Sequence, residues 1–511
     1  MRGNIRELVL WTLMILLIIF GCKRPPIKYD RTKEARGIWV TRWEWARADL
    51  TNNPEAMKQR IIEIFDRVKQ ARLNFVLFQI RGNGDAFYQS QHEPWSDLLT
   101  GELGKDPGWD PLEFAIQQAH DRGLELHTWI NTFPAWRGTS PPPHTKPEQL
   151  YNSHPEWLIH GKNGKAMPLS SHYVNLSPGI PEARQYVHDV CLDIIRNYDI
   201  DGFHFDYIRY PENSPELGYS MDPTSLKLFN SPNGNPKNLS WADWQRENIN
   251  KFVRKFYDTA NSIKPWLKIS AAVIGKYDYS IWNGYHVVYQ DALQWIKEGK
   301  IDFIAPMIYW QTDHPTAPFG EITEKWLKHY IHERYIFPGI SINKLGADNW
   351  AVDEVLKQVA ISRDGGNGMV FFSYSGLEKA MAQLENNGFQ YLANFPPLPW
   401  KKNSPPMDPR NLQFEIQPSG AVLLSWEKPD SLVDSTNVYR YNIFRSDKSP
   451  VDVLQAENLI HITSKPVYSY LDMGAHPEKT SYYVITALNR LNNESPPSNE
   501  VAVTFPRFVS R

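Results

Sequence analysis

The sequence predicts an α/β protein, a (β/α)8 TIM barrel followed by a small all-β sandwich. Short apolar segments alternate with helical or long connecting segments between residues 37 and 374. Such alternation indicates a parallel sheet, and eight units indicate a closed barrel. Beyond a proline-rich stretch the pattern changes to short alternating strands, which are typical of a sandwich. A doubly wound open sheet is the alternative, although no glycine-rich dinucleotide motif follows the first strand.

Each predicted strand is a short apolar run, and each after the first follows a helical stretch or a connection long enough for a crossover. The strands are expected at residues 37–40, 75–80, 124–130, 202–206, 267–274, 303–310, 336–342 and 369–374. Helices are expected at residues 53–72, 111–122, 181–198, 241–263 and 352–362. Two long connections remain, at residues 132–180 and 211–240.

The N-terminus has the pattern of a secretory signal. Arg2 and Arg6 precede an apolar run that ends at Gly21-Cys22. A basic segment followed by an apolar one is typical of export. The run before Cys22 resembles a bacterial lipobox, whose cysteine is lipidated after cleavage. We therefore expect a lipoprotein signal peptide at residues 1–22, with an uncleaved membrane anchor as the alternative.

The lipid would tether the protein to the bacterial cell envelope. Lys23 is not an acidic retention signal, which favours the outer membrane over the inner one. The other cysteine, Cys191, falls in an amphipathic helical stretch and is expected to be a buried apolar residue. No disulfide is possible in the mature chain.

The boundaries between the expected parts follow the composition. Residues 23–34 are polar and predict a tether, and residues 35–394 hold the barrel. Residues 395–409 are rich in proline and lysine and predict a linker. Residues 410–507 carry short strands whose order resembles a fibronectin type III module. Such modules usually space or bind, and we find no catalytic group in this one.

The overall composition narrows the partners. Lys and Arg nearly balance Asp and Glu, with a net charge of −2, so nothing points to nucleic acid. The chain holds 19 Trp and 25 Tyr. Flat rings stack on pyranose faces, which suits a glycan ligand. A large core of interdigitating rings is the alternative, and composition does not separate the two. Nothing in the sequence indicates an oligomeric state.

The segment from Asp201 to Pro211 ends an apolar strand abruptly in polar groups. Strand alternation places His204 and Asp206 on one face, opposite two phenylalanines. A carboxylate at the end of an apolar strand is costly unless something uses it. The structural alternative is that Asp206 pairs with Arg209 or caps the next turn.

Active sites of barrels form where the carboxyl ends of the strands meet. Polar and aromatic side chains collect at these predicted ends: Arg42, Glu44, Arg81, Asn83, Asp85, His127, Trp129, Asn131, His204, Asp206, Arg209, Tyr309, Trp310, Asp313, Asn343, Lys344, Ser373 and Tyr374. Several carboxylates among aromatic rings are typical of a glycoside hydrolase, which uses one carboxyl as acid and another as nucleophile or base.

Other kinds of catalysis have weaker support. His127, His204 and Asp206 could approach one another, but they lack the spacing of a metal site and no cysteine cluster accompanies them. Two histidines that hold a sugar hydroxyl or orient a carboxylate are the simpler interpretation. No G-x-S-x-G motif marks a serine nucleophile. We expect neither a metal nor another cofactor.

Several motifs together resemble the glycosyl-hydrolase-like 10 family of bacterial lipoproteins and secreted proteins. They lie at residues 36–40, 84–88, 95–101, 108–112, 127–131, 176–182, 201–206 and 305–310. The resemblance covers roughly residues 35–395. It implies a TIM barrel with glycosidase activity. It also implies a possible substrate, the glycan strands of peptidoglycan after their stem peptides have been removed.

These patterns predict a lipid-anchored hydrolase of O-glycosidic bonds. Asp206 is expected to be the nucleophile or base, with Glu44 as the first choice for the acid and Asp313 as the second. Substrate contacts are expected from Arg42, Trp43, Arg81, Asn83, Asp85, His127, Trp129, Asn131, His204, Tyr309 and Trp310. The alternative is a non-catalytic glycan-binding lipoprotein with a degenerate barrel.

Overall fold

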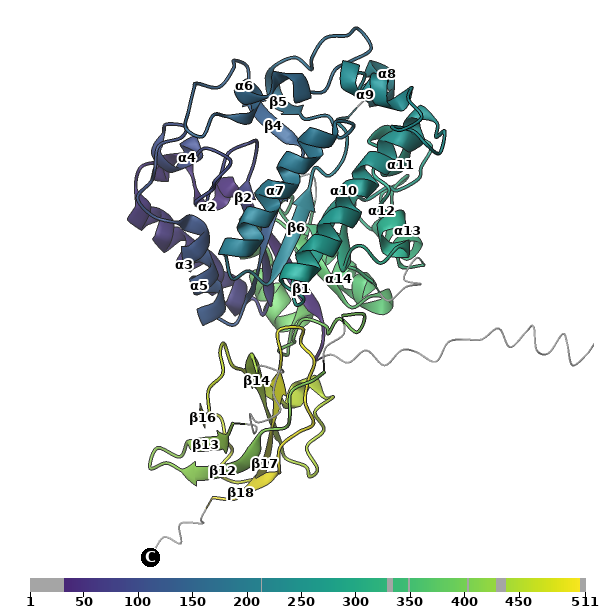
Figure 1. Cartoon of the computed structure of the whole chain (residues 1–511). Coiled ribbons are helices and arrows are strands. Elements are labelled where there is room, and N and C mark those ends of the chain that lie inside the picture. Colours follow the sequence, from purple (N-terminus) through teal and green to yellow (C-terminus); the bar gives the residue numbers. More distant parts are fainter. Residues whose placement is uncertain are drawn as a thin grey trace, which may run out of the picture.

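The computed structural model describes residues 32–505, apart from residues 213, 329–333, 348–349, 402–403 and 429–437. A barrel forms one end of the molecule and a β-sandwich the other (Figure 1). The expected signal peptide, its Cys22 and most of the expected tether lie outside the described residues. Within the described ranges, no helix combines the length and the apolar character needed to cross a membrane.

The barrel is closed, as the sequence predicts. Its parallel strands are β1 (Ala35–Val40), β2 (Phe75–Arg81), β3 (Glu125–Asn131), β6 (Gly202–Asp206), β7 (Lys268–Ile274), β8 (Phe303–Met307), β9 (Tyr335–Ile336) with β10 (Gly339–Ser341), and β11 (Gly368–Phe372). β1 pairs with both β11 and β2, and β10 pairs with both β8 and β11, which completes the ring. The seventh strand is split into β9 and β10, with Pro338 between them, because proline has no N–H to donate to a neighbouring strand.

The long helices that cover the barrel are α3 (Pro54–Gln70), α5 (Pro111–Asp121), α7 (Pro181–Asn197), α10 (Trp241–Ile263) and α14 (Val352–Gly365). Four of these five begin at a side-chain cap or a proline, which suit the first helical turn, and α14 has neither. Shorter ones are α2 (Arg42–Trp45), α4 (Asp97–Thr100), α6 (Leu150–Ser153), α8 (Ser214–Leu217), α9 (Pro223–Phe229), α11 (Gly284–Val287), α12 (Ala292–Lys297), α13 (Phe319–Leu327) and α15 (Leu377–Gln383). Each helix predicted from the sequence is present.

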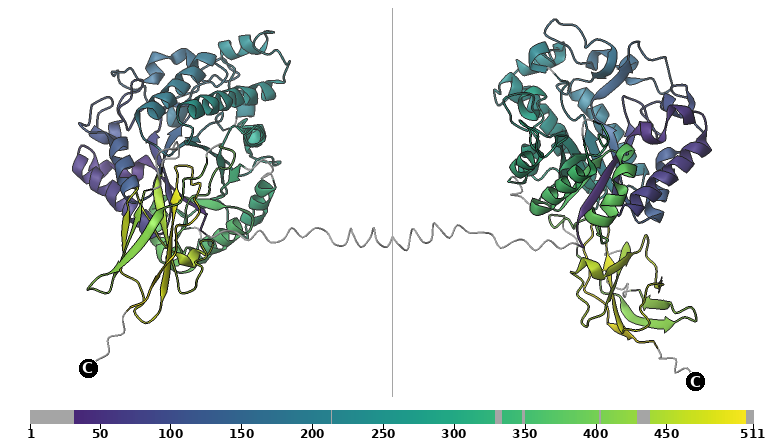
Figure 2. Two further views of the ribbon diagram at one scale, coloured as in Figure 1. Left: turned by 60° about the horizontal axis from the view of Figure 1, so that its bottom comes forward. Right: turned by 180° about the vertical axis from the view of Figure 1, so that it is seen from behind.

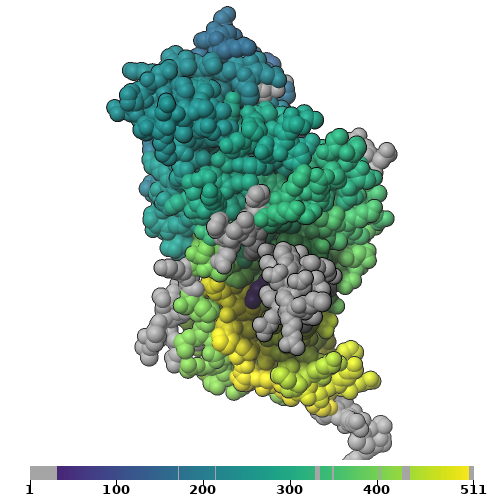
Figure 3. All heavy atoms as spheres, turned by 90° about the vertical axis from the view of Figure 1, so that its right-hand side faces the viewer, coloured from purple at the N-terminus to yellow at the C-terminus, as the bar shows by residue number. Residues whose placement is uncertain are grey.

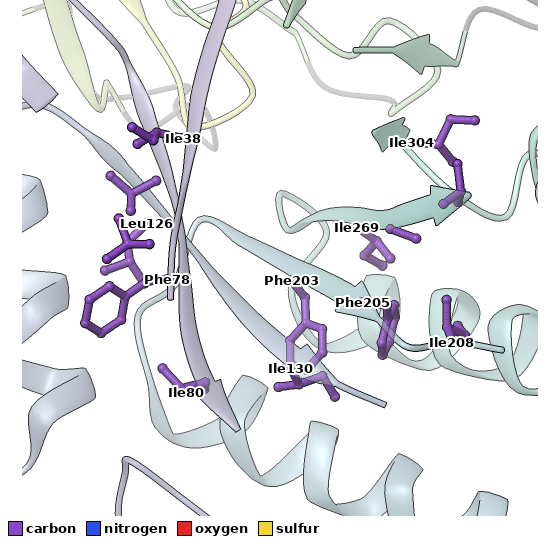
Figure 4. Close-up of a cluster of buried hydrophobic side chains, with 14 of the residues drawn as sticks. Ile38, Phe78, Ile80, Leu126, Ile130, Phe203, Phe205, Ile208, Ile269 and Ile304 are labelled. Atoms are coloured by element: carbon purple, nitrogen blue, oxygen red, sulfur yellow. The ribbon is translucent and has the colours of Figure 1, made fainter. Parts of the chain in front are cut away.

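The main core lies between the strands and these helices. Phe203 and Phe205 point outward from β6, and both rings contact Phe256 of α10 at centroid distances of 5.0 and 4.8 Å. Figure 4 shows the same outward layer continuing through Phe78, Ile130 and their neighbours. Because these alternate residues face the helices, the residues between them must face the barrel interior.

The two long connections lie over the carboxyl ends of the strands. The first contains the hairpin of β4 (Pro134–Gly138) and β5 (Ser170–Asn175), and the second contains α8 and α9. Both sit at the end of the barrel farthest from the sandwich (Figure 1). They therefore build walls on the face where barrel enzymes carry their sites.

The described part of the sandwich has seven antiparallel strands in two sheets. One sheet contains β12 (Arg410–Ile416), β13 (Val422–Glu427) and β16 (Ser469–Asp472). The other contains β14 (Arg440–Ser446), β15 (Leu459–Ile462), β17 (Ser481–Leu488) and β18 (Val501–Val503). Its small core is formed around Trp426, Tyr441 and Tyr483. This module lies at the amino end of the barrel, as Figure 1 and the right-hand view of Figure 2 show.

The segment expected to be a linker begins as part of the barrel. The ring of Phe395 closes the amino end of the barrel, 5.3 Å from Phe75 and 5.9 Å from Phe303 between ring centroids. Leu398 is buried in the same cluster, together with Leu491 of the sandwich. The proline content suggested a free linker, whereas the apolar residues between the prolines fill the open end of the barrel. Residues 32–34 of the expected tether are also packed, since Glu34 pairs with Arg36 and Arg363.

Figure 3 shows the sandwich lying directly below the barrel. Buried charges join the two parts. Glu125, at the start of β3, lies 3.0 Å from Arg440 of the sandwich and 3.1 Å from Lys268 of β7. Although burial favours the neutral carboxyl, these cations lower the pKa of Glu125 to about 2. Asp201 pairs in the same way with Arg490 at 3.1 Å. The sandwich is therefore fixed to the barrel by desolvated ion pairs as well as by apolar packing.

We predict that Arg440→Met destabilises the protein. The substitution leaves Glu125 buried with fewer cations, and breaking such pairs costs roughly 3–5 kcal/mol. Because Lys268 and Asn492 still contact Glu125, we expect about 2–3 kcal/mol. Denaturant unfolding measures the loss. Arg47→Met, which removes an exposed pair with Asp49, is the matched control and should change little. A stable Arg440→Met protein would show that the interface charges do not hold the two parts together.

Candidate active site

A cavity of about 190 Å3 opens at the carboxyl ends of the barrel strands. Seven barrel strands, segments that follow three of them and the β5 strand of the first long connection form its wall. The lining residues are Trp39, Thr41, Trp43, Gln79, Trp129, Asn131, Tyr173, Asp206, Tyr207, Arg209, Ala272, Met307, Tyr309 and Phe372. Aromatic rings dominate this wall, and Asp206 is the one carboxylate among the lining residues.

Asp206 is the last residue of β6 and points into the cavity. It is only 8% exposed. Its Oδ1 accepts a hydrogen bond of 2.6 Å from the backbone N–H of Tyr207, and its carbonyl oxygen accepts from Thr132. Burial raises the pKa of the Asp206 carboxyl, while the charge of Arg209 and the Tyr207 N–H oppose this shift only in part. The carboxyl is thus desolvated and next to open space, which suits proton transfer.

The segment after Asp206 folds back over the cavity. Tyr207 has φ of 49°, a left-handed conformation that turns the chain at the end of the strand. Its ring contacts Tyr173 of β5 at 5.0 Å between centroids. The guanidinium of Arg209 lies 4.6 Å from the centre of the Tyr207 ring. One side of the cavity is therefore made by two tyrosines and an arginine.

His204 lies below the cavity and does not line it. Its Nε2 is 3.0 Å from the indole Nε1 of Trp39 in β1, and its Nδ1 is 2.8 Å from the hydroxyl of Ser270 in β7. Because an indole can only donate, Nε2 accepts and the ring proton is on Nδ1. Burial holds the pKa of His204 well below its usual range, so the ring is neutral. His204 therefore connects β6 to β1 and β7 beneath the cavity.

Two further predicted contacts do line the cavity. Trp129 and Asn131 lie on β3, two residues apart, so both side chains face inward. The Asn131 amide is held by Gly82 and Gln79, at 3.0 and 3.2 Å. The indole Nε1 of Trp129 is buried and has no hydrogen-bond acceptor among the described residues. It is available to donate to a ligand oxygen.

Trp43 and Tyr309 also line the cavity. Trp43 is 44% exposed, and the guanidinium of Arg42 stacks on it at 3.9 Å from the ring centre. Arg42 lies behind this wall, where its Nη2 donates to Asn83 and to the hydroxyl of Tyr173, both at 3.2 Å. Tyr309 stacks on Phe372 at 5.3 Å. Trp310, predicted to contact sugar, is outside the lining residues and instead contacts Lys276 at 4.8 Å.

The two residues predicted as acid lie outside the lining residues. Glu44 accepts hydrogen bonds of 2.7 Å from the Thr41 N–H and the Ser373 hydroxyl, and another from the Ser375 N–H. It therefore ties the start of α2 to the segment after β11. Asp313 is exposed in the loop that follows β8. The identity of the acid stays a prediction.

Three predicted sugar contacts lie elsewhere. Arg81 forms a fully buried ion pair with Glu93 at 2.7 Å, and Asp85 accepts from the backbone N–H of Asn83 within its own loop. His127 faces inward near the amino end of the barrel, where it contacts Glu125 and stacks on Phe75. It lies four residues before the end of β3, which is roughly 13 Å at 3.3 Å per residue. His127 therefore does not reach the cavity, although it lies on a strand whose carboxyl end lines the cavity.

Sequence reasoning missed several lining residues. Tyr173 comes from the long connection, whose fold no local pattern predicted. Trp39 and Gln79 lie inside the predicted strands, where inward-facing residues two positions apart were the available signal. Arg209 was placed at the carboxyl end of its strand but was not predicted as a substrate contact. Tyr207, the next residue after Asp206, was not predicted as a site residue.

The larger cavity in the described part of the chain is not at this end. It measures about 730 Å3 and lies between α14, the residues near Glu34 and the sandwich. Several charged residues line it, and two of them, Arg363 and Glu34, pair with each other. Among the described residues, no group of three or more His, Cys, Asp or Glu side chains could hold a metal ion. The aromatic cavity around Asp206 is therefore the candidate active site.

The model of the family described as glycosyl hydrolase-like 10 matches residues 34–354. The chain belongs to this family. The match covers the barrel from β1 to the start of α14 and includes every residue that lines the cavity except Phe372. The family assignment and the position of the cavity thus agree.

Two relatives of this chain are named glycosyl hydrolases. The glycosyl hydrolase YngK of Bacillus subtilis is 28% identical over 495 residues, which cover 91% of this chain and 92% of the relative. The glycosyl hydrolase DigH of Escherichia coli K12 is 28% identical over 384 residues, which cover 67% of this chain and 83% of the relative.

A solved structure shares the fold. The glycoside hydrolase domain of PgaB (BpsB) from Bordetella bronchiseptica matches with a TM-score of 0.50 and 12% sequence identity. The match covers 69% of this chain and 98% of that domain. It agrees with the TIM barrel seen here.

In this member of the family we predict that Glu44→Ala acts mainly on stability. Hydrogen bonds to a charged group contribute roughly 1.5–3 kcal/mol, so the melting temperature should fall. The rate of glycan cleavage per folded molecule should change little. Thermal unfolding and cleavage are measured on one preparation, with Glu63→Ala on α3 as the exposed control. A loss of cleavage by more than a hundredfold in folded Glu44→Ala protein would restore Glu44 as the acid.

Proposed function

We propose that the protein is a lipid-anchored glycoside hydrolase of the cell envelope that cleaves O-glycosidic bonds in a glycan polymer. The observation that carries this proposal is Asp206, a desolvated carboxyl at the carboxyl end of β6 that faces an aromatic cavity. The family assignment supports glycosidase chemistry. The basic and apolar segments before Cys22 support the anchor.

The walls of the cavity suit a pyranose ring. Trp43, Tyr173 and Tyr309 offer flat faces, and Trp129 offers a buried N–H to a sugar hydroxyl. The aromatic faces would exclude water from the ring, while the unpaired donor would fix its orientation. This arrangement would place the glycosidic bond next to Asp206.

Hydrolysis needs one carboxyl to protonate the leaving oxygen and another to act as nucleophile or to activate water. Asp206 fills one of these roles. The partner must come from the loops around the cavity, and Asp313 is the candidate predicted from the sequence. Glu212 is a second one, because it is exposed in the loop after β6 and its charge helps to raise the pKa of Tyr207.

For the substrate we propose peptidoglycan strands whose stem peptides have been removed. This proposal rests on the resemblance to the family and on the expected place in the envelope. Incubating the purified protein with such strands, with intact peptidoglycan and with chitin oligomers, and assaying new reducing ends, tests it.

A non-catalytic glycan-binding protein is the second candidate. The observation in its favour is that the cavity is lined by one carboxylate rather than two. This candidate predicts binding of the glycan without any new reducing ends. The assay of new reducing ends therefore distinguishes the two candidates.

We predict that Asp206→Asn abolishes cleavage without destabilising the fold. Loss of an acid or base assistant costs roughly 10²–10⁴ in rate. The folded-state pKa of Asp206 is raised, so at neutral pH its ionised form costs stability, and a neutral Asn removes this cost. The variant should melt at the same temperature as the parent or higher. Cleavage near the parent rate would remove Asp206 from the mechanism.

The pH profile of kcat/KM should then assign the role of Asp206. If the residue is the nucleophile or base, activity should fall as the pH drops through its pKa, above the usual 3.9 or so for Asp. If it is the acid, activity should fall as the pH rises through the same pKa. The profile is then measured for Asp206→Asn with azide added to replace the carboxylate. The limb of the pH profile that disappears in this variant belongs to Asp206.

A further inference from the structure

Arg209 is a buried cation without an anionic partner among the residues that the structure describes. It lies three residues after Asp206, lines the cavity and is only 7% exposed. Its Nε is buried and contacts no acceptor among the described residues, and no described carboxylate forms an ion pair with its guanidinium. Burying a charge in this way is costly unless it is paired.

Other buried arginines of this chain show how such a charge is usually satisfied. Arg81 pairs with Glu93, Arg36 with Glu34, and Arg440 with Glu125, at distances of 2.6–3.0 Å. Each of these pairs lies away from the cavity. Arg209 differs from them both in its place at the cavity wall and in its missing partner.

Asp206 is not the missing anionic partner of Arg209. The two charges influence each other, but no ion pair joins them, and one Asp206 oxygen is taken by the Tyr207 N–H. The ring of Tyr207 under the guanidinium holds the arginine in position. A cation on an aromatic face contributes roughly 0.5–2 kcal/mol and leaves its N–H donors free for another acceptor.

A second arginine behind the rim has a free donor as well. Arg42 is 2% exposed, and its Nη1 is buried without an acceptor among the described residues, although its Nη2 binds Asn83 and Tyr173. The same tyrosine ring contacts Tyr207, which carries Arg209. Two arginines with unsatisfied donors among the described residues therefore lie on this side of the cavity.

We propose that Arg209 binds a free carboxylate on the sugar next to the scissile bond, so that the substrate is an anionic glycan. The inference rests on the proposed function and deepens it. The planar guanidinium matches a carboxylate with two parallel hydrogen bonds, whereas an amide offers one neutral acceptor. Such a carboxylate occurs in a uronic acid and in the lactyl ether of muramic acid once its peptide amide has been cleaved. Both sources present the same chemistry to Arg209.

The test compares substrates that differ only in this group. Peptide-free peptidoglycan strands are assayed beside the same strands after their carboxylates have been converted to methyl amides, and polyglucuronic acid serves as the uronate source. The parent protein should cleave the carboxylate strands roughly 10- to 100-fold faster than the amidated ones, the range expected for a charge-assisted hydrogen bond. Cleavage of the strands but not of polyglucuronic acid assigns the lactyl carboxylate, and the reverse result assigns a uronate.

Arg209→Gln should cleave both forms of the strands at one reduced rate, and Arg209→Lys should fall between it and the parent because a lysine keeps the charge without the planar fork. Arg47→Gln is the exposed control and should keep the full preference. Thermal unfolding of each variant shows that the comparison is made on folded protein. An equal rate on both forms by the parent, or an unchanged preference in Arg209→Gln, overturns the inference.

Binding separates this inference from the proposed function. Calorimetric titration with the same two strand preparations measures affinity in the parent and in Arg209→Gln. Tighter binding of the carboxylate form that depends on Arg209, without cleavage of any glycan, would keep the carboxylate site and overturn the hydrolase. Absence of both binding and cleavage would overturn both.

Discussion

The alternation of residues along β6 determines how the rest of the structure is arranged. Phe203 and Phe205 must face the helices because the outer core requires their rings. His204 and Asp206 must then face the barrel interior. His204 connects β1, β6 and β7 through Trp39 and Ser270, and this layer closes the interior below the site. Asp206, one layer above it, is left at the edge of an open cavity.

The two ends of the barrel differ in how their interior is filled and how their charges are paired. At the amino end the interior is filled by aromatic rings, with Phe395 from beyond the last strand as the final one. The charges around this plug are paired with residues of the sandwich, so neither part is complete without the other. At the carboxyl end Asp206 and Arg209 form no ion pair with any described residue. The amino end is rigid because its interior is filled and its charges are neutralised. The carboxyl end is open and offers hydrogen-bond donors to a ligand.

The electrostatics of the site follow from this difference. Burial raises the pKa of the Asp206 carboxyl, and a nearby guanidinium limits the rise without forming an ion pair. Both groups therefore remain available to a ligand. A closer pair would satisfy the charges and lower the pKa of the carboxyl, at the expense of both proton transfer and recognition.

The sequence by itself determined the fold class, the eight strands and the place of Asp206. Those features depend on local period and on the order of elements, which the chain carries directly. It did not determine which polar residues meet. His127 and Asp206 both face inward, yet they lie at opposite ends of the barrel because their depth depends on strand position and stagger. Tyr173 joins the cavity only through the fold of a long connection, and Phe395 turned an expected linker into a plug. Only the tertiary structure decided these contacts, because they join residues far apart in sequence whose side chains have no local preference for one another.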